Sequence, residues 1–423
     1  MKVNFETVMT SRNFIFRMLF PRPHSSIPPW ASFFFAAVSV ASLPGAQDFT
    51  LQLGQSTYEA VDSSLPLESV DAIKGGIAFG VASNVAYDSN FFIAENDPES
   101  ELTTVVAPWM SYRSDPESSA PLSIVASYAP SLLAYAKHSE FNGIDHSGAL
   151  EFMWQTHRTS LTAHVDYSER SLADRVAGTF VEGSIFSYGF DGGYQLGPRT
   201  RLLSRWDAVM TDYDTGAEGG ADAYITELGG LWDASERLSV GPALRYSATD
   251  SDTSGDREGI ALIMKARYKS RDRLRLASSA GLEFERNSRL GDDWEPSLVG
   301  GLSGDYRFAD HWILRIGVRY AKVPSPGFSN YQVNDLSFTT GLVRELGQGS
   351  LEAGAGFGIA DYEAVGTVSA TVPKEEYQNY YLTYRCPIFS DRASFDSTIR
   401  AVTSEGQRDW SQWQISTGLR IEF

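Results

Sequence analysis

Charged side chains recur at every second position in several stretches beyond residue 200. Lys265, Arg267 and Lys269 form one such run, and Arg273 and Arg275 form the next. Residues two apart in an extended strand point to the same side of a sheet, so each run would place its charges on one face. If that face lines a water-filled pore, its charges bias which solutes pass. The candidate pore-lining residues are Arg201, Arg205, Arg245, Lys265, Arg267, Lys269, Arg273, Arg275, Glu283, Glu285, Glu295, Arg315 and Arg319.

The order of these charges suggests two oppositely charged walls. The basic residues from Arg245 to Arg275 would form a patch on one wall, which Glu283, Glu285, Glu295 and Asp305 could oppose. A transverse field of this kind orients polar solutes and affects selectivity. The simpler interpretation, which we favour, is that these are ordinary lumen charges that pair between strands.

A second group of residues resembles part of a hydrolase site. Ser160, His164, Asp166 and Ser168 share the polar face of one expected strand. Residues at i and i+2 lie about 7 Å apart along a strand, which is too far for a direct hydrogen bond. A nucleophile–base contact would therefore need a partner from a neighbouring strand, and we predict that the chain is not an enzyme.

Metal and cofactor chemistry has little support in the sequence. The acidic stretches 250–256 and 212–214 could offer carboxylate oxygens to Ca²⁺, but they lack a full ligand set. Cys386 is the single cysteine, so neither an intramolecular disulfide nor a cysteine-based metal site can form. The sequence has no glycine-rich phosphate loop, and the alternating Gly354, Gly356 and Gly358 are interpreted as strand packing. We predict no cofactor and no metal.

The segments that would position these side chains alternate between apolar and polar residues. Between residues 237 and 248, Leu238, Val240, Leu244 and Tyr246 alternate with small or polar side chains. This pattern is typical of a strand with one apolar and one polar face. The alternating segments are longer than the ~5–6 residues common in soluble strands, and they reach the ~9–11 needed to cross a bilayer at a tilt. The predicted fold is an all-β, transmembrane, antiparallel up-and-down barrel of about 18 strands, with 16–18 plausible.

The connections support the same fold. Short links, such as 197–200 and 309–312, alternate with long polar links, such as 89–100 and 169–182, as in barrels with short periplasmic turns and longer outer loops. An even strand number returns the C-terminus to the periplasm. The strands are predicted at 76–88, 101–113, 121–136, 146–156, 159–168, 183–196, 200–212, 222–233, 237–248, 258–269, 273–286, 294–308, 312–323, 333–346, 350–362, 376–386, 392–403 and 410–423.

The N-terminal residues look like an export signal. Arg12, Arg17 and Arg22 precede a short apolar stretch, residues 30–41, and small residues follow as far as Ala46. This is the pattern of a cleaved secretory signal peptide. We assign residues 1–46 to the signal, 47–74 to a short periplasmic extension and 75–423 to the barrel. A start at Met18, cleavage near residue 41 or 42, a membrane anchor and a partial plug at 47–74 remain open alternatives.

Composition argues against a nucleic-acid partner and is compatible with a location in a membrane. The net charge of −18 and the pI near 4.8 argue against nucleic-acid binding. Mean hydropathy is only −0.22, but a transmembrane barrel can be this polar because lipid meets only every second strand residue.

The last strand carries a pattern that could guide assembly. Ser416, Gly418, Ile421 and Phe423 follow the order polar, glycine, apolar, aromatic, which resembles the C-terminal signal recognised by the barrel assembly machinery. An exposed, alternating edge strand can pair with an open strand of another protein. Aromatic girdles are expected on the lipid face near strand ends, at Tyr87, Tyr167, Trp206, Trp232, Tyr246, Tyr268, Phe284, Trp294, Tyr306, Phe308, Trp312, Tyr320 and Phe423.

Several turn-and-strand patterns resemble one family of barrels. They are residues 85–92, with Tyr87-Asp88-Ser-Asn90, followed by 103–108, and the hairpins that begin at Tyr194 and Leu231. From about residue 75 onward the chain resembles the β-barrel porin 2 family, which includes barrels encoded with exopolysaccharide export systems. The resemblance implies an outer-membrane location and a pore-like role, and it transfers no catalytic residue.

Together these observations predict a passive channel of the Gram-negative outer membrane for polar solutes or polysaccharide. One alternative is a surface barrel whose outer loops bind a partner without an open pore, and another is an outer-membrane hydrolase. The expected partners are outer-membrane lipid and lipopolysaccharide, the assembly machinery during biogenesis and polysaccharide export components.

Overall fold

The computed structural model describes most of the chain beyond residue 74. The predicted signal peptide and the predicted extension, residues 1–46 and 47–74, lie outside the described residues. The described ranges are 75–114, 121–174, 179–213, 220–251, 255–270, 273–288, 291–324, 331–364, 374–388, 392–406 and 409–423.

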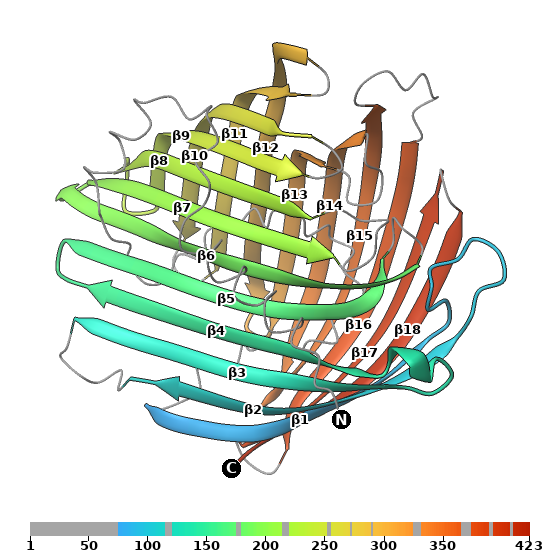
Figure 1. Ribbon diagram of the computed structural model, residues 1–423. Helices are drawn as coiled ribbons and strands as arrows, with labels where there is room; N and C mark the ends of the chain where they lie inside the picture. Colours follow the sequence, from blue (N-terminus) through green and yellow to red (C-terminus); the bar gives the residue numbers. More distant parts are fainter. Residues whose placement is uncertain are drawn as a thin grey trace, which may run out of the picture. The chain divides into compact units, whose positions relative to one another are not determined.

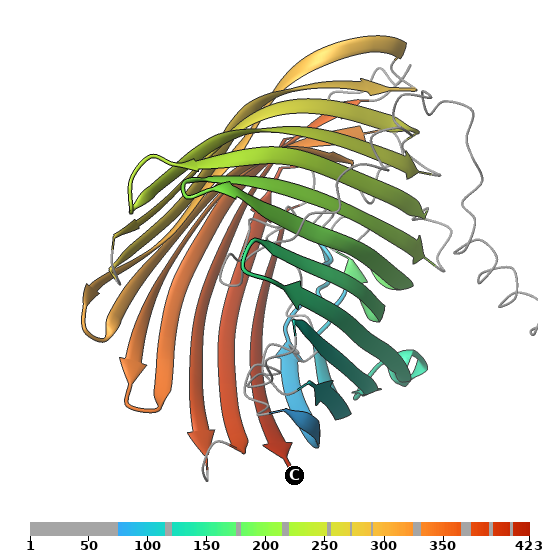
Figure 2. The same cartoon turned by 90° about the vertical axis from the view of Figure 1, so that its left-hand side faces the viewer.

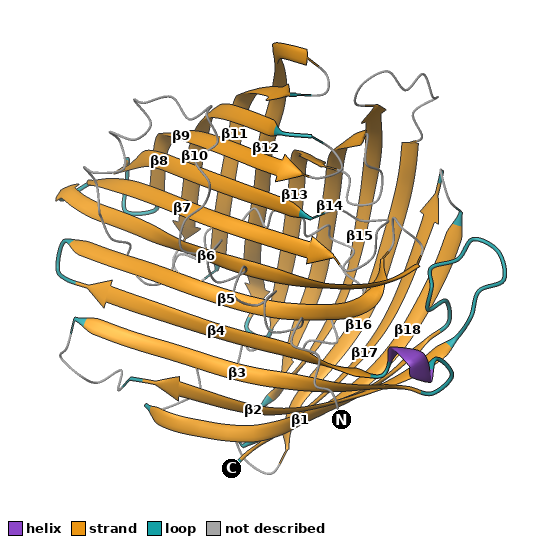
Figure 3. Cartoon of the chain, in the orientation of Figure 1, coloured by secondary structure: helices purple, strands orange, loops and turns teal. Residues whose placement is uncertain are grey.

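Eighteen strands account for nearly all of the described residues (Figure 3). One short 3₁₀ helix, η2 (Ser139–Phe141), lies between the third and fourth strands. The strands are β1 (Gly76–Asp88), β2 (Glu101–Arg113), β3 (Leu122–Tyr135), β4 (Gly143–Gln155), β5 (Thr159–Asp174), β6 (Thr179–Gly197), β7 (Thr200–Tyr213), β8 (Ala221–Asp233), β9 (Leu238–Ser251), β10 (Arg257–Ser270), β11 (Leu274–Asn287), β12 (Gly291–Ala309), β13 (Trp312–Pro324), β14 (Tyr331–Leu346), β15 (Gly349–Ala364), β16 (Lys374–Ile388), β17 (Ala393–Glu405) and β18 (Trp410–Glu422).

Each strand pairs antiparallel with its neighbours in sequence, and the sheet closes on itself. β1 pairs with β18 from Gly80↔Glu422 to Asp88↔Gln414, so no edge strand remains in the ladder. Figures 1 and 2 show the strands in colour order around the sheet, with red β18 beside blue β1. The predicted eighteen-stranded antiparallel barrel is confirmed.

The predicted strand boundaries agree closely, with one informative exception. The hairpin of β5 and β6 extends farther than expected, to Asp174 and from Thr179, instead of 159–168 and 183–196. Its outer end keeps the ladder through pairs such as Glu169↔Ser184. Residues 169–171 and the residues opposite them, 182–184, are polar or glycine on both faces, so the apolar alternation that identified the other strands is interrupted there.

Alternation along the strands separates two faces. On β18, Gln412, Gln414 and Ser416 are buried on one side, while Trp413 and Ile415 are exposed on the other. Large apolar side chains with more than half of their surface exposed occur on many strands. They are Ile77, Phe79, Met110, Ile144, Leu196, Trp232, Leu244, Leu262, Met264, Leu298 and Phe423.

So much exposed apolar surface is abnormal for a protein in water. A band of this kind matches the lipid-facing side of an outer-membrane barrel. Trp232, Tyr246, Phe284 and Trp294 of the predicted girdles are exposed on this face. Short turns such as 198–199 lie at one end of the strands, which we take as periplasmic, and the long connections lie at the other.

Among the described residues, no helix has the length and apolar character that spanning a membrane would require.

Candidate functional site

The face opposite the apolar band is the concave one, as contacts between second-neighbour strands show. Arg245 Nη2 on β9 lies 3.2 Å from Glu283 Oε2 on β11, across the intervening β10. Arg307 Nη2 on β12 likewise reaches Glu345 Oε1 on β14 at 2.8 Å. Side chains can bridge over a strand only where the sheet curves toward them, so these charges line the inside of the barrel.

Many of the predicted pore-lining residues form ion pairs there. Arg245 and Glu283 are 7% and 5% exposed, so this pair is almost fully withdrawn from water. Arg201 Nη2 lies 3.2 Å from Asp233 Oδ1. Further ion pairs join Arg205 to Asp207, Lys265 to Glu227, Glu285 to Arg257, and Arg315 to both Asp305 and Glu352. The structure therefore shows cross-strand ion pairing, the simpler of the two sequence interpretations.

Other predicted residues stand apart from this network. Lys269, Arg273 and Arg275 are exposed, and no ion pair to them is formed within the described part of the chain. Arg267 and Arg319 share the inward side of β10 and β13 with Lys265 and Arg315. Glu295 is exposed near the outer end of β12 and lies directly opposite Glu285.

The structure shows where the basic and acidic side chains lie, and the expected transverse field stays a prediction. On β11, Arg275 lies at the turn end, and Glu283 and Glu285 lie at the loop end of the same strand. Glu283 and Glu285 form ion pairs with Arg245 and Arg257.

Amide side chains gather around the Asp88 carboxylate at the seam of the barrel. Gln412 Nε2 and Gln414 Nε2 on β18 each donate to Asp88 Oδ2 on β1 at 2.7 Å. Asn90 Nδ2 donates to the Ser411 carbonyl at 3.1 Å, which ties the β1–β2 connection to the start of β18. This polar network holds the closing strands together on their inner side.

The residues considered for hydrolysis do not form a catalytic triad. The Ser160 hydroxyl is buried and has no hydrogen-bond partner in the described structure. His164 Nε2 lies 3.7 Å from Asp207 Oδ1 on β7. Ser160 and His164 are four positions apart on one strand, which corresponds to about 13 Å. Ser160 is therefore too far from His164 for the nucleophile–base contact that a triad needs.

The acidic stretches considered for Ca²⁺ lie partly outside the described residues. Among the residues that are described, no three or more His, Cys, Asp or Glu side chains are grouped closely enough to hold a metal ion.

Sequence reasoning missed a cluster at the outer mouth. Glu101, fully buried at the start of β2, accepts hydrogen bonds from the backbone N–H groups of Ala136, Lys137 and His138 at 2.9–3.2 Å. His138 Nδ1 lies 2.6 Å from Glu101 Oε2, and its Nε2 lies 3.1 Å from Glu99 Oε2. The imidazole is thus held between two carboxylates.

Aromatic side chains surround this cluster. Phe91 stacks on His138 with ring centroids 5.7 Å apart. Phe91 also contacts Tyr135 and Phe180, and Phe141 stacks on Phe180 at 4.0 Å. The β1–β2 connection, the β3–β4 connection and the start of β6 therefore meet in one contact, and no local pattern in the sequence brings these segments together.

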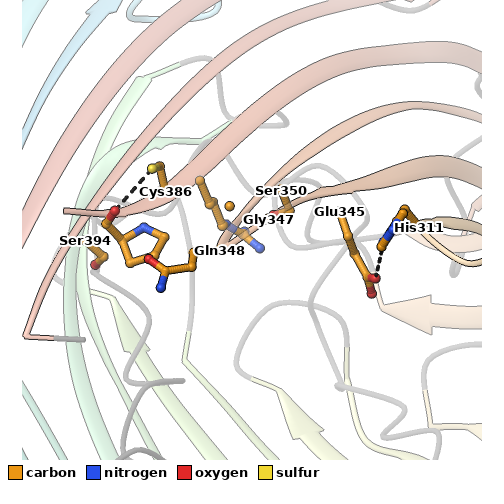
Figure 4. A pocket seen from close by; sticks show the side chains of 10 residues that line it. His311, Glu345, Gly347, Gln348, Ser350, Cys386 and Ser394 are labelled. Atoms are coloured by element: carbon orange, nitrogen blue, oxygen red, sulfur yellow. Dashed lines mark hydrogen bonds and ion pairs between the residues drawn. The ribbon is translucent and has the colours of Figure 1, made fainter. Parts of the chain in front are cut away.

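A depression of about 490 Å³ lies at the periplasmic turn between β14 and β15 (Figure 4). His311 Nδ1 approaches Glu345 Oε2 at 3.7 Å on one side. Cys386 Sγ donates to the Pro387 carbonyl at 3.2 Å on the other. Gly347, in the turn between them, has a positive φ of 65°, which favours glycine. We assign no ligand to this depression.

The C-terminal residues of the predicted assembly signal complete the closing strand. Phe423 packs against Phe79 of β1 with ring centroids 6.0 Å apart. Ser416 and Gly418 face inward, and Ile421 and Phe423 face outward. Recognition of these residues by the assembly machinery stays a prediction.

An eighteen-stranded antiparallel barrel with an apolar outer face and a charged inner face defines a class of protein, the outer-membrane β-barrels. The chain is accordingly a Gram-negative outer-membrane β-barrel.

Comparison with known proteins adds solved structures of low similarity. No family model matches the chain, and no curated protein does. OpdK of Pseudomonas aeruginosa, solved with vanillate, has a TM-score of 0.47 and 10% identity, covering 82% of this chain and 99% of that one. Acinetobacter baumannii OccAB3 has a TM-score of 0.46, 7% identity and the same coverage. The siderophore receptor PirA of Pseudomonas aeruginosa has a TM-score of 0.41 and 10% identity, covering 82% and 81%.

Proposed function

We propose that this barrel is a passive channel for polar solutes across the outer membrane. The carrying observation is the charged inner face, where side chains keep substantial contact with solvent. Arg315 and Asp305 face the lumen with 49% and 54% of their side-chain surface exposed. Barrels of 16–18 strands are wide enough to leave an aqueous channel between their walls. Transport would be diffusion. The lumen charges would select solutes by the sign of their charge, and loops folded into the lumen would limit their size.

Solute flux into liposomes tests this proposal. Vesicles that contain the purified protein should swell in iso-osmotic solutions of small sugars, at rates that fall as sugar size increases. Protein-free vesicles are the control for leakage. Swelling no faster than in these vesicles, with the protein shown to be folded and inserted, would contradict a channel.

Polysaccharide is the more specific substrate class that we propose. The support is the resemblance to the β-barrel porin 2 family, some of whose members are encoded with exopolysaccharide export systems. We expect oligosaccharides to enter the vesicles, and components of polysaccharide export are the expected partners. Exclusion of every oligosaccharide larger than a disaccharide would limit the function to small solutes.

A surface-binding barrel is the second candidate, and the outer cluster favours it. Glu101, His138 and Phe91 fix the outer connections in a defined arrangement, which a binding surface requires. Folded protein that inserts but transports nothing would support this candidate over the channel.

A further inference from the structure

Four basic residues gather at the periplasmic end of β9, β10 and β11. Lys269 lies directly opposite Arg275 in the β10–β11 register. The Lys269 backbone N–H donates to the Arg237 carbonyl at 2.8 Å, which places Arg237 beside Lys269 on the other flank. Arg273 lies in the turn directly before β11, where its carbonyl accepts a hydrogen bond from the Arg307 backbone N–H at 2.7 Å. All four residues are exposed.

Among the described residues, the four cations have no ion-pair partner. Within the described residues, no ion pair forms to Arg237, Lys269, Arg273 or Arg275, whereas most lumen cations farther along the strands are paired. Asp305 lies opposite Arg275 on β12 but is 3.8 Å from Arg315 Nε instead. Like charges directly opposite each other destabilise a sheet, so a bound anion would relieve a repulsion that the fold retains.

The outer end of the same wall differs because its cations are paired. Glu285 faces Glu295 in the β11–β12 register and forms an ion pair with Arg257. Glu285 is ten positions from Arg275, which is about 33 Å along the strand. A solute would therefore meet a paired cation, Arg257, at one end of this wall and unpaired cations at the other.

We propose that Arg237, Lys269, Arg273 and Arg275 form a binding site for multivalent anions at the periplasmic mouth. Its ligands would be solutes that carry two or more carboxylate or phosphate groups and that approach from the periplasm. Guanidinium groups suit this task because they hold carboxylates and phosphates through paired hydrogen bonds. The proposal rests on the channel function proposed above. It implies that multivalent anions bind more strongly from the periplasmic side than from the outer side.

Single-channel recording with citrate as the probe tests the site. Each inserted channel is oriented by biotin on Asn96→Cys, in a Cys386→Ser background, with streptavidin added to one side. Citrate added on the periplasmic side should reduce the current, and citrate on the outer side should have a much smaller effect. Equal effects from both sides would overturn the proposal.

Substitutions assign the effect to the four residues. In low salt, the concentration of citrate for half-block should rise about three- to fivefold for each charge removed in Lys269→Gln and Arg275→Gln. The matched control is Arg344→Gln, which removes a cation from the outward face near the same end of the barrel, beside Trp312. Arg275→Lys keeps the charge and should keep the block. Loss of block in Arg344→Gln alone would contradict the site.

Calorimetry on the detergent-solubilised protein separates this proposal from the channel itself. Citrate binding that Lys269→Gln weakens, in a protein that conducts no current, would refute the channel and leave the anion site. Conductance without citrate binding would refute the site and leave the channel.

Discussion

Glu101 holds the outer connections together from a buried position. A buried carboxylate is costly unless it is satisfied by hydrogen bonds, and this one accepts them from three successive backbone N–H groups, 136–138, and from the imidazole of His138. Hydrogen bonds to a charged group contribute more than neutral ones. The side chain therefore fixes the β3–β4 connection onto the start of β2.

Replacing Glu101 by Gln should loosen that connection. The amide keeps the shape but loses the charge and turns an NH₂ donor toward backbone donors, so we expect a loss of about 2 kcal/mol in local stability. Hydrogen exchange at amides 136–138 should then be roughly 30-fold faster. Glu140→Gln, an exposed acid of η2, is the matched control and should leave exchange unchanged. Equal protection in the two variants would contradict this role of Glu101.

His138 should make the same contact sensitive to pH. Burial lowers the pKa of His138, but the hydrogen bonds to Glu101 and Glu99 outweigh it and raise the pKa above its ordinary value. A raised pKa means that the stabilisation is fully present below the ordinary value, near 6.5, and is lost as the pH rises through the higher value. The outer connections should be tightest in mild acid.

Exchange at the same amides, corrected for its intrinsic pH dependence, measures this effect. Protection should decline as the pH rises above the ordinary histidine pKa, near 6.5, in the native chain and stay level in His138→Gln. A decline of the same size in both would show that another group is responsible.

At the scale of elements, β15 and β16 fit together through glycines. A Cβ at Gly358 would lie 2.0 Å from the ring of Tyr377, and one at Gly354 would lie 2.3 Å from the ring of Tyr381. Tyr377 is 2% exposed and donates its hydroxyl to Asp335 of β14. The interpretation of these glycines as strand packing is confirmed, since they provide the space for two tyrosine rings.

Gly358→Ala should therefore destabilise the barrel. The new methyl group forces the buried Tyr377 ring to move, and we expect a loss of about 1–3 kcal/mol in the free energy of unfolding. Gly356→Ala is the matched control on the same face, since its Cβ would meet its nearest neighbours at an ordinary 3.7–3.8 Å. Urea unfolding in lipid vesicles should give a clear decrease for Gly358→Ala and a change within about 0.5 kcal/mol for Gly356→Ala. The reverse order would contradict the packing argument.

The sequence is sufficient for the strands because alternation is a local property. Leu238 to Tyr246 already identify a strand and its apolar face, and the short turns set the pairing of the next strand. The outer end of β5 and β6 was missed because residues such as Glu169 and Ser184 do not alternate. The contact between Glu101 and His138 was missed because it joins residues 37 positions apart through two loops.

At the scale of the whole molecule, sequence reasoning could not give the height of each charge within the barrel. The residue types and their inward orientation follow from alternation, but their height in the barrel depends on the register between strands. Once that register is known, Lys269 and Arg275 lie together at one end and Glu285 and Glu295 lie together at the other. Ion pairs such as Arg245–Glu283 bridge second-neighbour strands, which the sequence pattern alone does not reveal.

The central claim is that water fills the inside of the barrel and that lipid surrounds its outer face. Two adjacent residues on β11 give the most direct test of it. Ser279 faces inward and pairs with Lys265, whereas the next residue, Ala280, faces outward and is exposed beside Met264. In a Cys386→Ser background, Ser279→Cys and Ala280→Cys differ only in the face they occupy. With the protein in lipid vesicles, a charged, membrane-impermeant thiol reagent should modify the cysteine at 279 and leave the one at 280 unreacted. Equal modification of both, or modification of 280 alone, would contradict the account.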